Sequence, residues 1–69
     1  MSDSVYKKIE VTGTSTEGQD AAIRNAIARA SKTVKEMRWY EVVDSRGSVR
    51  NGDVEQFQVT LKIGFKLTE

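Results

Sequence analysis

The sequence predicts an α+β fold with the element order β-α-β-β, built from one helix and one three-stranded antiparallel sheet. Three observations carry this prediction. Two segments alternate between apolar and polar residues, the segment between them repeats apolar residues every three or four positions, and an Asn-Gly pair separates the last two strands. With 69 residues, the chain is expected to form a single domain over residues 1–69.

The first predicted strand covers residues 5–12, where Val5, Lys7, Ile9 and Val11 alternate with more polar neighbours. Residues 13–18 are rich in Gly, Thr and Ser and are expected to form a loop. Thr16 is followed three residues later by Gln19, which matches a capping box at the start of a helix.

The helix is predicted from residue 19 to about residue 37. Its apolar positions recur at helical spacing, and they are Ala22, Ile23, Ala26, Ile27, Ala30, Val34 and Met37. Basic residues near the expected end suit the negative pole of a helix. Because the apolar stripe is rich in alanine, we expect the sheet to approach the helix closely.

The second and third strands are predicted over residues 39–49 and 54–67, joined by a type I′ turn at Asn51-Gly52. The core face of the last strand is expected to carry Phe57, Val59, Leu61, Ile63, Phe65 and Leu67. A two-residue loop pairs Arg50 with Asp53. This register places Trp39 opposite Gly64, where the missing side chain leaves room for a large ring.

In the same register, Ser45 lies opposite Gln58. The face away from the core then carries Trp39, Glu41, Val43 and Ser45 together with Gln58, Thr60, Lys62 and Gly64. Simple alternation puts Arg46 on the core side, and only a bulge at Gly47 would turn it toward Trp39. The helix covers one face of the sheet, and the predicted elements leave the other face without a cover.

Composition excludes several classes of protein. The chain has 11 basic and 10 acidic residues and a net charge of +1, which argues against a nucleic-acid partner. No apolar run approaches the roughly 20 residues of a membrane span, and no secretory signal opens the chain, so we expect a cytoplasmic protein without a membrane partner. A chain this short buries only about 60% of its unfolded surface. Since it also has no Cys, it is expected to gain stability by oligomerisation.

Catalytic and metal-binding groups are scarce. The chain has neither His nor Cys, and its carboxylates are scattered without the spacing of an acid–base pair. We therefore predict that it is not an enzyme and has no metal site. The loop at residues 13–18 could hold an anion at the helix N-terminus, but it lacks the lysine of a P-loop, so an ordinary strand-to-helix turn is favoured.

Three side chains are candidates for a ligand site. Trp39 can stack on a flat ligand, although it can equally fill an apolar patch between subunits. Gln58 offers both a donor and an acceptor, which suits the imide edge of a flavin or a pyrimidine-like ring, or it is simply a polar residue on a strand. Arg46 can contact a ring or a phosphate, or remain a solvated charge in a turn.

The order and spacing of short segments along almost the whole chain resemble those of the dodecins, small flavin-binding proteins. The matching segments are Val5-Tyr6-Lys7-Lys8-Ile9-Glu10, Gly13-Thr14-Ser15, Ala28-Arg29-Ala30-Ser31-Lys32-Thr33, Trp39-Tyr40-Glu41-Val42, Ser45-Arg46-Gly47, Phe57-Gln58-Val59 and Lys62-Ile63-Gly64-Phe65-Lys66-Leu67.

The resemblance implies a protomer whose sheet wraps around the helix, and a hollow homo-dodecamer of tetrahedral symmetry. It implies two flavins stacked between a symmetry-related pair of tryptophans, which Trp39 matches. The glutamine that hydrogen-bonds the isoalloxazine matches Gln58, and an arginine near the flavin in bacterial members matches Arg46. Tyr40 stands where many relatives have Phe or Ala. A second site for coenzyme A is implied but is not placed on any residue.

From this resemblance we expect non-enzymatic binding, storage and sequestration of FMN or riboflavin, with FAD as a further candidate. Stacking on Trp39 would quench the light-excited flavin and so protect the cell from photosensitised damage. Two other functions stay open: a scaffold oligomer whose Trp39 contacts only protein, and a small flavoenzyme subunit. Uptake of added flavin distinguishes the first of these from a flavin-binding protein.

Overall fold

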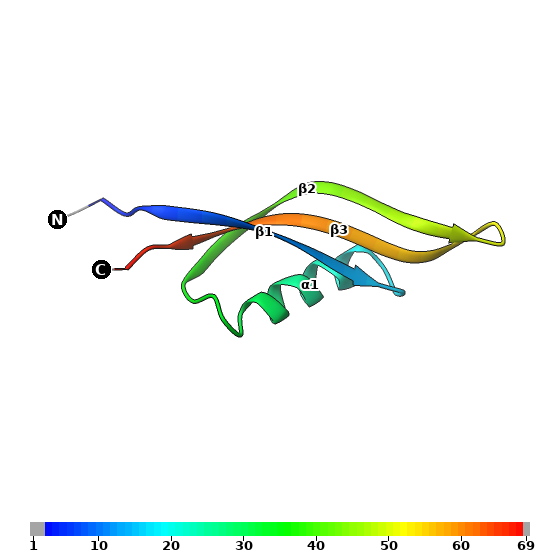
Figure 1. Cartoon of the computed structure of the whole chain (residues 1–69), viewed down its shortest axis with the longest axis horizontal. Helices are drawn as coiled ribbons and strands as arrows, with labels where there is room; N and C mark the ends of the chain where they lie inside the picture. The colour runs from blue at the N-terminus through cyan, green and yellow to red at the C-terminus, as the bar shows by residue number, and fades with distance from the viewer. Residues whose placement is uncertain (1–2, 69) are drawn as a thin grey trace.

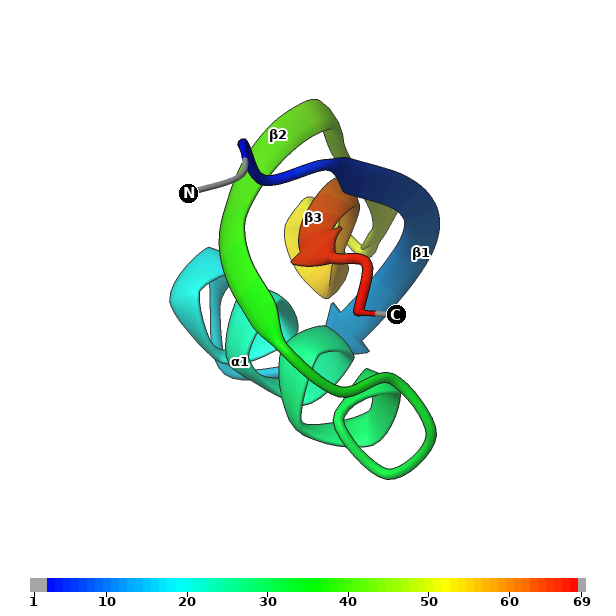
Figure 2. The same ribbon diagram turned by 90° about the vertical axis from the view of Figure 1, so that its left-hand side faces the viewer.

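Three strands and one helix follow one another as β1 (Tyr6–Ser15), α1 (Gln19–Ala30), β2 (Met37–Arg50) and β3 (Asp53–Lys66). The computed structural model describes residues 3–68, and its strands form one antiparallel sheet in the order β1-β3-β2 (Figure 1). The predicted α+β fold and its β-α-β-β order are confirmed. Seen along its length, the sheet curves over α1, which lies on one side of it (Figure 2).

The core lies between α1 and the two strands β1 and β3. Its buried members come from the helix stripe and from alternate positions of β3, and they are Ala22, Ala26, Val59, Leu61 and Ile63. Gly13 of β1 lies directly against the helix, because a Cβ atom there would overlap the carbonyl oxygen of Ala22. The alanine-rich stripe therefore lets the sheet approach closely, as predicted.

The helix is shorter than its periodicity predicts, because it ends at Ala30 and not near residue 37. The next turn closes with a backbone bond from the Val34 N–H to the Ala30 carbonyl (2.9 Å), and Glu36 then adopts a positive φ of 62°. This sharp change of direction brings Met37 into β2, from where it packs against the same core. The apolar pattern continues past the end of the helix because Met37 contributes its apolar side chain to the core from β2.

The predicted capping box is absent. Gly18 is the N-cap, and no side chain caps the first turn. The Gln19 amide instead donates to the Ser45 hydroxyl of β2, and the Ser15 hydroxyl accepts a bond from the Glu17 backbone N–H (2.9 Å). Since β1 runs on to Ser15, the loop before the helix is only three residues long.

The hairpin between β2 and β3 turns where it was predicted. Asn51 and Gly52 both have positive φ, 54° and 76°, as a type I′ turn requires. Arg50 pairs with Asp53 at the turn, and Trp39 pairs with Gly64 at the far end. Both of these predicted pairings are confirmed.

Between these two pairs the register differs from the prediction. One extra residue in β3, Glu55, shifts the pairing, and one extra residue in β2, Val43, shifts it back. Within the shifted stretch Ser45 lies opposite Val59, and Arg46 lies opposite Gln58. The two offsets cancel, which is why a simple count from the turn still finds the partner of Trp39.

The shift exchanges the faces of two predicted residues. Ser45 points to the helix side, where it contacts Gln19, so its predicted place beside Trp39 is wrong. Arg46 instead lies on the face away from the helix, across from Gln58. The bulge that moves Arg46 from the core side to this face lies at Val43, and not at Gly47 as predicted.

The molecule is elongated, with principal extents of 57 × 20 × 13 Å and a radius of gyration of 14.5 Å. A compact domain of this length has a radius of about 11 Å. The strands extend beyond α1 at both ends, and the β2–β3 hairpin also extends beyond β1 (Figure 1). Because α1 packs on β1 and β3, apolar side chains of the hairpin strands stay exposed, including Tyr40, Val42, Val49 and Val54.

Candidate functional site

The sheet face opposite α1 forms a ladder of side chains from all three strands, which we call the indole face. The register assigns to it Tyr6, Lys8, Glu10, Thr12 and Thr14 of β1, Trp39, Glu41, Asp44 and Arg46 of β2, and Gln58, Thr60, Lys62, Gly64 and Lys66 of β3. Polar residues dominate this face, and its aromatic side chains lie together at one end.

The indole of Trp39 lies over the backbone of Gly64. A Cβ atom at Gly64 would overlap the indole carbons Cε2, Cζ2 and Cη2, so only glycine leaves room for the ring there. Tyr6 reaches across from β1 and meets the indole edge-on, with ring centroids 5.2 Å apart and an interplanar angle of 71°. Trp39 nevertheless stays 41% exposed. The arrangement is an aromatic surface fixed at its base and open to a flat partner.

An ion pair lies beside the indole. Lys8 lies opposite Gly64, and its Nζ contacts Oε1 of Glu41 at 2.9 Å across β3. The hydrogen bond from Lys8 and its charge lower the pKa of Glu41, with smaller contributions from the Trp39 side chain and Lys62. Since the folded-state pKa is lowered, the stabilising effect of the pair persists above the ordinary carboxyl range and is lost as the pH falls through the lowered pKa.

Replacement of Lys8 by Gln should raise the pKa of Glu41 toward its ordinary value, because both principal causes of the shift disappear. Carbon-detected NMR titration of the Glu41 carboxyl group measures this directly. The matched control is Lys7→Gln, which removes a neighbouring lysine that alternates to the other face of β1. A Glu41 titration that is the same in Lys8→Gln and in the parent would contradict the assignment.

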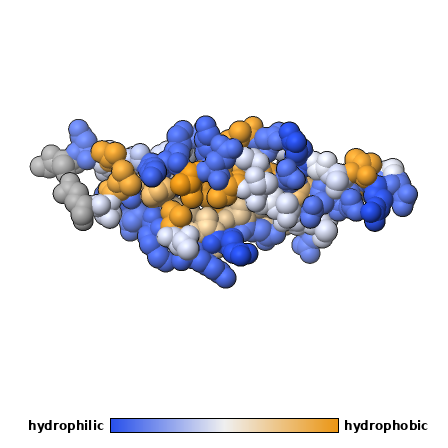
Figure 3. Space-filling view, viewed as in Figure 1, coloured by the Kyte–Doolittle hydropathy of each residue, from blue (hydrophilic) through white to orange (hydrophobic). Residues whose placement is uncertain are grey.

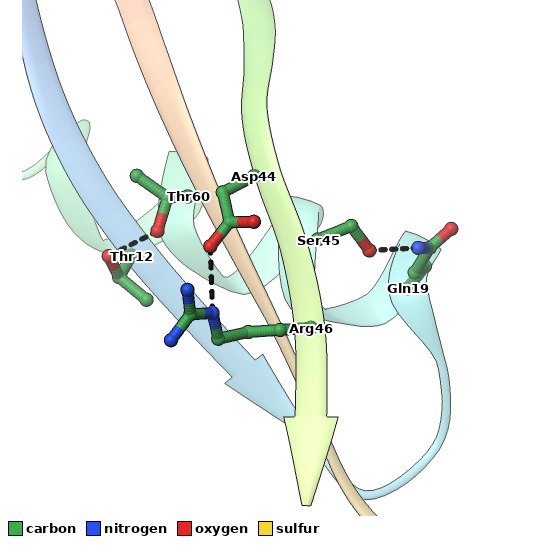
Figure 4. A network of polar contacts seen from close by, with 6 residues as sticks. All are labelled: Thr12, Gln19, Asp44, Ser45, Arg46 and Thr60. Atoms are coloured by element: carbon green, nitrogen blue, oxygen red, sulfur yellow. Dashed lines mark hydrogen bonds and ion pairs between the residues drawn. The ribbon is translucent and has the colours of Figure 1, made fainter.

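The other end of the indole face carries Arg46, which is drawn in Figure 4, and Gln58, which lies opposite it on β3. The Arg46 Nε donates to Asp44 Oδ2 at 2.8 Å, and the hydroxyls of Thr12 and Thr60 share a hydrogen bond of 2.8 Å beside them. Gln58 lies between Thr14 and Arg46 in the ladder. This end combines a carboxamide, a guanidinium and hydroxyls, which together can bind the polar edge and a substituent of a ring.

The structure places all three predicted site residues on one face, but it does not bring them together within one chain. Gln58 and Gly64, which lies beneath Trp39, are six residues apart along β3, or about 20 Å. Gln58 and Trp39 therefore share a face of the sheet, as predicted, but within one chain they do not lie beside each other. We call the end with Trp39 and Tyr6 the indole end, and the end with Gln58 and Arg46 the amide end.

Sequence reasoning missed two neighbours of these residues. The contact of Tyr6 with Trp39 depends on the strand order, which puts β1 and β2 on either side of β3, with Tyr6 opposite Lys66 and Trp39 opposite Gly64. Asp44 and Arg46 are two residues apart on β2 and share a face in any register. The bulge at Val43, for which the sequence carries no turn residue or other local signal, puts both residues on the indole face.

Within residues 3–68, no three His, Cys, Asp or Glu side chains lie close enough together to hold a metal ion. The single helix described there is too short and too polar to cross a membrane.

Comparisons with known proteins agree over nearly the full length. The Dodecin family model matches residues 5–68. The dodecin of Thermus thermophilus is 49% identical over 65 residues, which cover 94% of both chains. The calcium dodecin of Mycobacterium tuberculosis is 30% identical over 64 residues, which cover 93% of this chain and 90% of that protein.

Solved structures give the same result in three dimensions. Streptomyces coelicolor dodecin superposes with a TM-score of 0.92 at 48% identity and covers 100% of this chain and 99% of its own. Streptomyces davaonensis dodecin superposes equally well, with a TM-score of 0.92 at 47% identity over 99% of this chain and 100% of that one. Sequence and fold agree from end to end, and this chain belongs to the dodecin family.

Proposed function

We propose that this protein binds flavin and stores it in a quenched form, without catalysing a reaction. Dodecins are known for flavin binding and are in general not enzymes. The observation that carries the proposal is the indole of Trp39, which is held over Gly64, braced by Tyr6 and left 41% exposed. A fused three-ring isoalloxazine can cover this surface by offset stacking.

Stacking also explains how the flavin would be quenched. An electron-rich indole in van der Waals contact with a light-excited flavin donates an electron and takes it back, so the absorbed energy is released as heat. The flavin is unchanged at the end of the cycle. This process needs contact between two rings and no acid, base or nucleophile, and the indole end supplies that contact.

The distance between the two ends of the indole face supports a site in which two copies of the chain meet at each flavin. An isoalloxazine is shorter than the span of about 20 Å that separates Trp39 from Gln58 along β3. We therefore propose that a flavin stacked on Trp39 of one copy meets Gln58 and Arg46 of a second copy. In a two-fold arrangement each copy gives an indole end to one flavin and an amide end to the other.

Self-assembly is supported by the surface of the protomer. Hydrophobic side chains gather over the middle of the molecule, and further ones lie at the hairpin end (Figure 3). Tyr40, Val42 and Val49 are 47%, 51% and 73% exposed. Burial of such side chains against other copies stabilises a chain that is too short to stabilise itself fully. We propose the homo-dodecamer that the family resemblance implies.

The test is a titration of flavin-free protein with riboflavin, FMN and FAD, followed by flavin fluorescence, after light scattering has checked for a particle of about twelve chains. We expect saturable binding of riboflavin and FMN with nearly complete quenching. A folded oligomer that takes up none of the three flavins would contradict the proposal and favour a scaffold.

A further inference from the structure

Arg46 has an acidic partner that the proposed function does not use. The Arg46 Nε and Asp44 Oδ2 are 2.8 Å apart, and both side chains are partly open to solvent, at 67% for Arg46 and 43% for Asp44. The bulge at Val43 turns both residues onto the indole face, where they lie two residues apart at the amide end. A ligand that contacts Arg46 on this face therefore also lies close to Asp44.

We infer that Asp44 determines how strongly the site prefers a phosphorylated flavin over an unphosphorylated one. This inference rests on the proposed function and concerns the same site. The guanidinium of Arg46 attracts a flavin phosphate, whereas the carboxylate of Asp44 repels it from almost the same position. Riboflavin carries no charge, so neither group changes its binding by this route.

The geometry leaves room for both anions on one guanidinium. Asp44 accepts a hydrogen bond from the Nε of Arg46, and Figure 4 draws no hydrogen bond from the two terminal nitrogens of that guanidinium. A phosphate can bind those two nitrogens side by side, as guanidinium groups bind phosphates elsewhere. The carboxylate would then stay within a few ångströms of the phosphate and weaken its binding.

Within one chain, the residues that flank this pair of charges are uncharged. Asp44 and Arg46 each lie in a row of three residues that face one another across the three strands. The other four residues of these two rows are uncharged, and they are Thr12, Thr14, Gln58 and Thr60. The next row holds Lys62 between Glu10 and Glu41, so its single positive charge is flanked by two negative ones. Asp44 is thus the acidic group best placed to oppose Arg46.

The experiment compares the dissociation constants of riboflavin and FMN in the parent and in Asp44→Asn. Asn keeps an oxygen that accepts the bond from the Arg46 Nε, so the change removes charge and preserves orientation. We expect FMN to bind about three- to tenfold more tightly relative to riboflavin, with the effect falling toward zero in about 1 M salt, where screening is strong. Arg46→Ala should change the same ratio in the opposite direction.

Glu55→Gln is the matched control. Glu55 pairs with Arg50 at 3.3 Å, and the exposures of 42% and 72% are close to those of the Asp44–Arg46 pair, but this pair lies next to the hairpin turn. The ratio of the FMN and riboflavin dissociation constants in Glu55→Gln should equal that of the parent. If Asp44→Asn binds both flavins with the parent's ratio at low salt, the inference is wrong and the proposed function stands. If the parent binds neither flavin, both are wrong.

Discussion

Flavin affinity should fall by more than about 100-fold when Trp39 is replaced by Ala, because the ring loses both apolar cover and stacking. Removing on the order of 100 Å² of apolar contact costs about 2.5 kcal/mol, and an aromatic pair adds about 0.5–1.5 kcal/mol. The remaining bound flavin should also become more fluorescent, since its electron donor is gone. Titration by flavin fluorescence measures the affinity and the quenching together.

Tyr40→Ala is the control for Trp39→Ala. Tyr40 is the next residue in β2 and is similarly exposed, at 47% against 41%, but it lies on the helix side of the sheet. In oligomers of parental size, Tyr40→Ala should keep its flavin affinity. An intact Trp39→Ala oligomer with the affinity and quenching of the parent would refute the stacking role of the indole.

Replacement of Gln58 by Ala should weaken flavin binding by about 1–3 kcal/mol, or about five- to 150-fold, because the polar edge of the ring loses its partner in a desolvated site. Gln58→Glu should bind more weakly still near neutral pH. An ionised carboxylate only accepts hydrogen bonds, and it would face the carbonyl oxygens of the flavin imide. Flavin titrations of both variants, with oligomer size checked first, give the answer.

Gln56→Ala tests whether the effect belongs to position 58. Gln56 has the same side chain on the same face of β3 and lies opposite Ser48, one row nearer the hairpin turn. Its removal should leave flavin affinity close to that of the parent. If Gln58→Ala and Gln58→Glu also bind like the parent, Gln58 does not contact the ring edge.

The sheet could be predicted because each of its signals is local. Alternation identified β3 and its core residues Val59, Leu61 and Ile63, and Asn51-Gly52 identified the turn. The end of the helix could not be found in this way, since Met37 fits the helical period and also packs on the core from β2. Glu36 changes the direction of the chain although it is not a residue that favours positive φ.

The candidate site shows a sharper limit. The pairing of Trp39 with Gly64 followed from counting residues back from the turn, and it survived because the bulges at Val43 and Glu55 cancel. Between the bulges the count failed, so Arg46 was assigned to the wrong face. A bulge depends on how the strands twist and pair in three dimensions. Val43 and Glu55 are not residue types that predict one.

The separation of Trp39 and Gln58 was not predicted, because residues assigned to the same face can lie far apart along a strand. That distance leads to the central claim that one flavin takes Trp39 from one copy and Gln58 from another. The claim is tested by unfolding Trp39→Ala and Gln58→Ala chains together, refolding them into mixed oligomers and titrating these with FMN.

In every pair that contains one chain of each kind, one site regains both residues, so random mixing should restore about a quarter of the sites to parental affinity and quenching. Each variant refolded alone should show none. A mixture whose refolded oligomers contain both chains, yet bind FMN no better than the variants alone, would mean that each chain uses its own tryptophan and glutamine.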